Sequence, residues 1–166
     1  ELIAPDPAQA EPALPRPFGL DDLALRERIA ERPRLVHYVC RVPALEAIAG
    51  LDPGYDPGPI MSMTRGARSW RITMPQDGAS AARRWSETGR LQPTLIEWAG
   101  GAAPGRHPVD TLAASGVTLT RLRLCAPPDL ALPAALREDP RVTRVDASRP
   151  ALGAELSTPR GWRLID

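Results

Sequence analysis

The stretch that decides the fold is LVHYVCRVP, residues 35–43. Its side chains alternate: those at 36, 38, 40 and 42 form one face, and His37, Val39 and Arg41 form the other. This is the period of a β-strand with one core face and one partly polar face. Pro43 ends the strand because proline has no backbone N–H to donate, and proline also favours the first position of a helix. We therefore expect a strand over 35–42, followed by a short apolar helix over 44–51.

The rest of the chain continues and then repeats this order of elements. After turn residues at 52–59, short strands are expected at 60–64 and 69–74, a helical or mobile polar stretch at 76–90, and a strand at 93–99. Beyond a glycine-rich loop come a strand at 117–125, a helix at 129–138, and strands at 141–147, 151–157 and 161–165. This internal repetition predicts an α+β protein made of βαβββ units with curled mixed sheets.

Composition narrows the function classes. The chain has 166 residues, 43% of them hydrophobic and 25% charged, and all 21 basic residues are arginine, which fits a GC-rich coding sequence. A net charge of +1 argues against nucleic acid as a partner, and no apolar run is long enough for a membrane span. Two distant cysteines, Cys40 and Cys125, favour reduced thiols and a cytoplasmic location.

The N-terminal residues resemble the end of one unit joined to the next. Residues 1–4 have the pattern of a strand tail, and prolines up to residue 17 form a stiff connector. A helix over 20–31, capped by Asp21 or Asp22, precedes the strand at 35–42. We interpret 1–19 as a strand end and connector from a preceding βαβββ unit, 20–109 as an intact unit and 110–166 as a degenerate second unit. All would form one compact domain, and a further N-terminal segment is expected.

Four short stretches in this order carry a resemblance to a known family. They are ELIAPDP at the start, VHYVCRVPALEAI from residue 36, LIEW followed by His107-Pro108, and AELSTPRG near the end. Together with the repeat, they resemble the vicinal oxygen chelate superfamily and, within it, the glyoxalase-like domain branch. The resemblance implies paired βαβββ units whose curled sheets form a cup, with a divalent metal held by residues of the first and fourth strands.

The resemblance also implies specific site residues. His37 stands at the histidine ligand position on the first strand, Glu97 at the carboxylate position on the fourth strand, and Glu1 at the carboxylate position of the preceding unit. Such a set suits Zn, Fe, Mn or Ni, and a carboxylate that leaves the metal can serve as a general base. Glu97 is therefore the catalytic candidate. Arg41, on the strand face of His37, is the candidate for binding an anionic part of the substrate.

The residues taken alone leave other interpretations open. His37 fits a hydrogen-bonded histidine, and Glu97 fits a carboxylate on an edge strand that faces water. The arginines at 65, 68 and 71 fit either an anion site or solvent-facing positions, and the second is favoured in a chain whose only cationic side chain is arginine. Two functions follow: a metal-dependent lyase, isomerase or dioxygenase acting on a small molecule with vicinal oxygens, or a metal-free protein of the same fold that binds small molecules. A homodimer is a further expectation.

Overall fold

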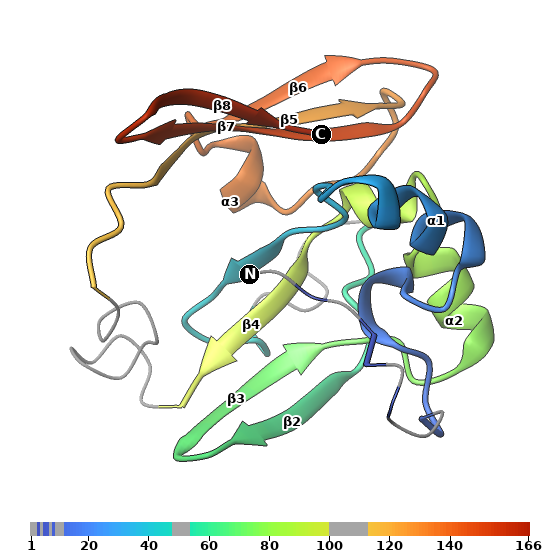
Figure 1. Ribbon diagram of the computed structural model, residues 1–166. Coiled ribbons are helices and arrows are strands. Elements are labelled where there is room, and N and C mark those ends of the chain that lie inside the picture. The colour runs from blue at the N-terminus through green and yellow to red at the C-terminus, as the bar shows by residue number, and fades with distance from the viewer. Residues whose placement is uncertain (1–2, 4, 7, 9–11, 48–53, 100–112) are drawn as a thin grey trace.

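The computed structural model describes residues 3, 5, 6, 8, 12–47, 54–99 and 113–166, which form short helices and two four-stranded sheets (Figure 1). In chain order the elements are η1 (Pro17–Gly19), α1 (Leu23–Glu31), β1 (Val39–Arg41), β2 (Ile60–Arg65), β3 (Arg68–Thr73), α2 (Gly78–Arg84), η2 (Gly89–Leu91), β4 (Thr94–Trp98), β5 (Thr118–Ala126), α3 (Ala134–Arg137), β6 (Val142–Asp146), β7 (Ala151–Thr158) and β8 (Gly161–Ile165).

The two mixed sheets, with the helices, make this an α+β fold, but the sheets differ in strand order. The N-terminal sheet has the order β1-β4-β3-β2, in which β1 runs parallel to β4 and the other neighbours are antiparallel. The C-terminal sheet has the order β6-β5-β7-β8, with β5 parallel to β6 and antiparallel to β7. The first strand of each sheet therefore has different neighbours. The predicted α+β class is confirmed, whereas a repeated βαβββ unit is not.

The sheets enclose α3 and neighbouring loops, while α1 and α2 both lie at one end of the molecule (Figure 1). Leu122 and Leu124 of β5 pack with Leu152 of β7 and with Leu91 of η2, so the C-terminal sheet turns its apolar face toward the rest of the molecule. A second cluster joins Ile72 of β3 to α2 and Trp85. These contacts bury one face of each sheet and leave sheet edges and helix surfaces exposed.

The helices begin where side chains satisfy their first N–H groups. Asp22 accepts hydrogen bonds from the backbone N–H groups of Ala24 and Leu25, so the expected cap of α1 is confirmed at Asp22. Asp77 caps α2 by accepting from the N–H of Ser80 at 2.8 Å. In the part of the chain that the structure describes, no helix is long and apolar enough to span a bilayer.

The strand β1 is shorter than the predicted strand over 35–42. Its neighbour β4 begins only at Thr94, because η2 and Pro93 precede it, and residues 35–38 therefore have no continuous strand beside them. The helix expected at 129–138 is reduced to α3, which begins after Pro133. The helix expected at 44–51 falls partly on residues 48–53, outside the described residues.

Candidate functional site

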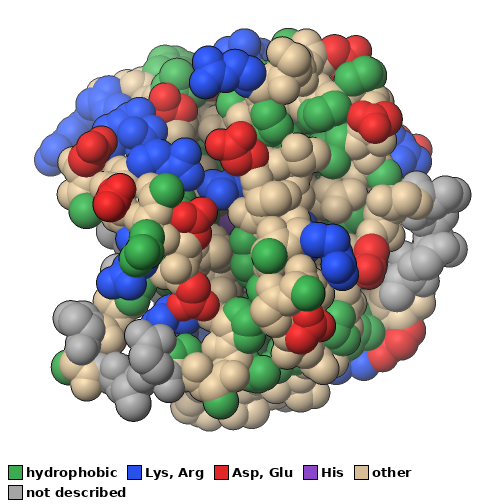
Figure 2. Space-filling model, turned by 90° about the vertical axis from the view of Figure 1, so that its right-hand side faces the viewer, with side chains coloured by type: hydrophobic (Ala, Val, Ile, Leu, Met, Phe, Trp, Pro, Cys, Tyr) green, Lys and Arg blue, Asp and Glu red, His purple; other side chains and the backbone are tan. Residues whose placement is uncertain are grey.

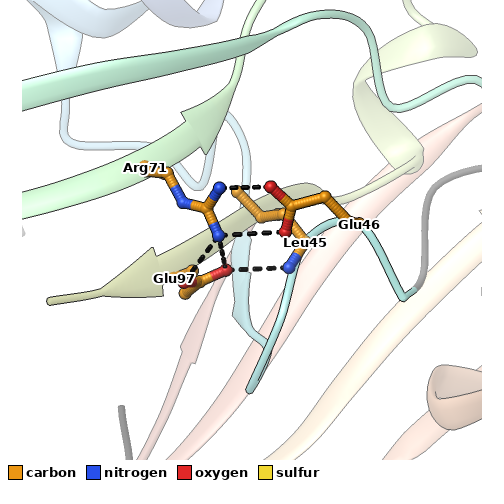
Figure 3. Close-up of polar contacts among 4 residues, drawn as sticks. All are labelled: Leu45, Glu46, Arg71 and Glu97. Carbon is orange, nitrogen blue, oxygen red and sulfur yellow. Dashed lines mark hydrogen bonds and ion pairs between the residues drawn. The ribbon is translucent and has the colours of Figure 1, made fainter. Parts of the chain in front are cut away.

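Glu97, the candidate catalytic residue, lies on β4 and is held by an arginine. The register of β3 and β4 places Arg71 directly opposite Glu97. The Arg71 Nη2 atom donates to both carboxylate oxygens of Glu97, at 2.7 Å to Oε1 and 2.6 Å to Oε2 (Figure 3). The backbone N–H of Leu45 donates to Oε2 at 2.8 Å. Glu97 is thus an ionised, hydrogen-bonded carboxylate whose side chain is only 20% exposed.

The same guanidinium also binds Glu46, which follows β1 in the chain. Arg71 Nη2 lies 2.9 Å from Glu46 Oε2, and Nη1 donates to Glu46 Oε1 (Figure 3). The hydrogen bonds from Arg71 lower the pKa of both Glu46 and Glu97. The two carboxylates in turn raise the pKa of Arg71. This cluster of Glu46, Arg71 and Glu97, which we call the Arg71 cluster, ties β3, β4 and the segment after β1 together.

His37, the predicted histidine ligand, is fixed by hydrogen bonds on both ring nitrogens. Nδ1 lies 2.9 Å from the carbonyl oxygen of Arg90, which can only accept, so Nδ1 carries the proton. Nε2 lies 2.9 Å from Thr94 Oγ1 and accepts from this hydroxyl in the neutral ring. The ring stacks on Phe18 and meets the edge of Trp85 at centroid distances of 5.3 and 5.1 Å. Burial, together with the nearby Arg84 charge, lowers the pKa of His37 to about 3, so the ring is neutral at physiological pH.

His37 and Glu97 do not form one site. His37 lies beside the beginning of β4 and bonds to Thr94, whereas Glu97 lies toward the end of the same strand. Thr94 and Glu97 also point to opposite faces, because three positions separate them on a strand. Neither His37 nitrogen has a lone pair directed at an open position, and Arg71 occupies the Glu97 carboxylate. As they lie in the structure, this pair does not fit a shared metal ion.

The other predicted site residues add no third ligand. Arg41 lies on β1 opposite Ile96, with an exposed side chain. Glu1 lies outside the described residues. Within residues 3–99 and 113–166, leaving aside the undescribed positions between them, no group of three or more histidine, cysteine, aspartate or glutamate side chains could hold a metal. The described residues at this place therefore do not form a metal centre.

A pocket of about 1020 Å³ lies between α1 and the extended segment before β1. Phe18, Leu23, Ile29 and Val36 supply much of its apolar wall, and the His37 ring borders it. Its charged side chains are those of Arg26, Glu27 and Arg34, and His37 and Tyr38 also line it. Figure 2 looks onto the side of the molecule that carries α1 and α2. It shows basic side chains gathered in the upper left, interspersed with acidic ones, above a hollowed region.

The comparisons with known proteins now identify the family. A family model described as a glyoxalase-like domain matches residues 1–139. The chain belongs to the glyoxalase-like domain family. This membership is consistent with the vicinal oxygen chelate superfamily, as the sequence resemblance predicted. No curated protein and no solved structure matched the chain.

The matched residues of this glyoxalase-like protein include both sheet elements of the Arg71 cluster and the whole pocket wall. A solvent-facing position was expected for Arg71, whereas its guanidinium binds Glu97. The available signal was its place on the strand before Glu97, with an ionisable side chain on each of two adjacent strands. The register that puts the two side chains opposite each other is visible only in the folded sheet.

Proposed function

We propose that this glyoxalase-like protein binds a small organic molecule in the pocket between α1 and residues 33–39, without a metal ion. The pocket carries this proposal, since about 1020 Å³ is at the upper end of the usual volume of small-molecule sites. An apolar wall with a few polar groups at its border is typical of such sites. The ligand expected from this wall has an apolar, ring-containing body and one polar or anionic end, which Arg26 or Arg34 would meet.

His37 supports the same proposal in a limited role. Its two hydrogen bonds fix the ring orientation, and its stacking on Phe18 gives this side of the pocket a rigid aromatic border. A neutral, fully hydrogen-bonded imidazole offers a ligand its ring face, not a proton or a lone pair. His37 is therefore proposed as a wall residue that shapes the pocket.

Two variants in which an alanine of α1 is replaced by tryptophan test the proposal. The probe is anilinonaphthalene sulfonate, which combines an aromatic body with an anionic end, and its fluorescence and a titration calorimeter report binding. We expect one saturable site in the native protein. Ala30→Trp, which places a bulky side chain at the pocket wall, should weaken binding at least tenfold. Ala24→Trp, on the same helix but outside the wall, should leave binding unchanged.

A chelator separates this function from the metal-dependent one. Binding that survives EDTA supports the proposal, whereas equal binding in the Ala30→Trp variant, or loss of binding on chelation, contradicts it. The metal-dependent lyase, isomerase or dioxygenase implied by the family resemblance stays a prediction. It requires ligands beyond the pair His37 and Glu97, and a stoichiometric transition metal in protein purified without chelators would support it.

A further inference from the structure

The Arg71 cluster has the geometry of a small cation site whose cation belongs to the chain. Three carboxylate oxygens surround the Nη2 atom of Arg71: Glu97 Oε2 at 2.6 Å, Glu97 Oε1 at 2.7 Å and Glu46 Oε2 at 2.9 Å. Carboxylate oxygens surround a bound calcium ion at about 2.3–2.6 Å, which is only slightly closer. The carboxylate oxygens thus lie around the guanidinium nitrogen at distances close to those around a bound divalent ion.

The frame around this nitrogen is built by strands. Arg71 and Glu97 are direct neighbours on antiparallel strands, so backbone hydrogen bonds fix the distance between their Cα atoms. The Leu45 N–H holds Oε2 of Glu97 from the other side, and Glu46 is the next residue along that segment. The Glu97 carboxylate is therefore held by Arg71 and by a backbone N–H, and the Glu46 carboxylate is held by Arg71.

We propose that Arg71 is the resident cation of this sheet face and occupies the Glu97 carboxylate in place of the metal ion that the family resemblance implies. Glu97 is then a structural anchor for the segment after β1 and is not a metal ligand. Removing the guanidinium leaves three carboxylate oxygens around an open position. Hard divalent cations such as Mn²⁺ prefer such oxygen ligands. The proposal is independent of the small-molecule pocket, because Glu46, Arg71 and Glu97 do not border it.

Titration calorimetry with MnCl₂ tests the proposal on the full chain. We expect no saturable Mn²⁺ binding by the native protein at millimolar concentrations. Arg71→Ala should bind one Mn²⁺ saturably, with an affinity at least tenfold above that of any weak binding by the native protein. Arg71→Lys keeps a cation at the position and should behave like the native protein. The double variant Arg71→Ala/Glu97→Gln should lose the gain, because one of the carboxylates no longer carries a charge.

Even if Arg71→Ala does not fold, metal binding by the native protein and by a second variant still tests the proposal. Arg71→Met, which retains much of the apolar stem, is the second variant, and circular dichroism checks its fold. Saturable micromolar binding of Mn²⁺, Zn²⁺ or Ni²⁺ by the native protein that disappears in Glu97→Gln would overturn the proposal. So would folded Arg71→Ala and Arg71→Met variants without any gain in Mn²⁺ binding.

Discussion

The neutral, buried state of His37 predicts a specific loss of stability in mild acid. Its pKa is 6.5 in the unfolded chain and about 3 in the folded protein, chiefly because burial disfavours the charged ring. Between these pH values only the unfolded chain binds the proton, so the free energy of unfolding falls as the pH falls below 6.5. The slope approaches about 1.4 kcal/mol per pH unit. From pH 7 to pH 5, His37 alone should remove about 2 kcal/mol of stability.

Urea unfolding of the native protein and of His37→Gln at pH 7, 6 and 5 measures this loss. Glutamine retains a donor and an acceptor but does not titrate, so carboxylates and His107 contribute equally to both proteins and cancel in the difference. We expect the stability gap between native protein and variant to shrink by about 2 kcal/mol from pH 7 to pH 5. A gap that stays constant within about 0.5 kcal/mol over this range would show that His37 is not held neutral, and the reasoning from its burial would be wrong.

Three further predictions test the packing and the hydrogen bonds of the fold, two of them with a matched control substitution. Leu124→Ala, at a fully buried position of β5, should lower the free energy of unfolding by about 2–5 kcal/mol. Leu164→Ala, at a position of β8 that is 65% exposed, should change it by less than about 0.5 kcal/mol, and chemical denaturation of both variants measures the difference. Gly89→Ala should destabilise the protein by more than about 1 kcal/mol, because the new Cβ would lie 2.2 Å from a backbone carbonyl oxygen. Gly78→Ala adds a Cβ in open space and should be neutral or stabilising, so equal melting temperatures of the two variants would contradict the prediction. Arg84→Met should expose the loop after α2 to hydrogen exchange, since the backbone carbonyls of Gly89, Gln92 and Pro93 each lose the hydrogen bond from Arg84, and unchanged protection there would refute it.

The sequence predicts where helices and strands lie better than it predicts which strands pair in a sheet. Alternation in residues 35–42 and the proline after them locate a strand near β1, and the strands expected at 60–64 and 69–74 correspond to β2 and β3. The strand order of the C-terminal sheet has no such local signal. Which strands become neighbours depends on long-range packing, and two stretches with the same order of elements can pair differently.

The candidate site shows the same limit at the level of side chains. On β4, alternation puts Glu97 on the face opposite Thr94, and this is visible in the sequence. The parallel register Cys40↔Leu95 is not visible there, and it places Glu97 on the face of Cys40, away from His37. The family resemblance assigns both residues to one metal by position in their strands. In the folded sheet, the register places His37 and Glu97 on opposite faces, and the opposing Arg71 binds the Glu97 carboxylate.

The different strand orders of the two sheets also give them different entropies of assembly. The parallel pair that completes the N-terminal sheet, Val39↔Thr94, joins residues about 55 positions apart, whereas Leu122↔Val142 in the C-terminal sheet joins residues about 20 positions apart. Closing the longer loop costs about 1 kcal/mol more in chain entropy. The C-terminal parallel pair therefore needs less loop closure to form from an unfolded chain, and β1, which follows His37, joins β4 only when the larger loop is closed.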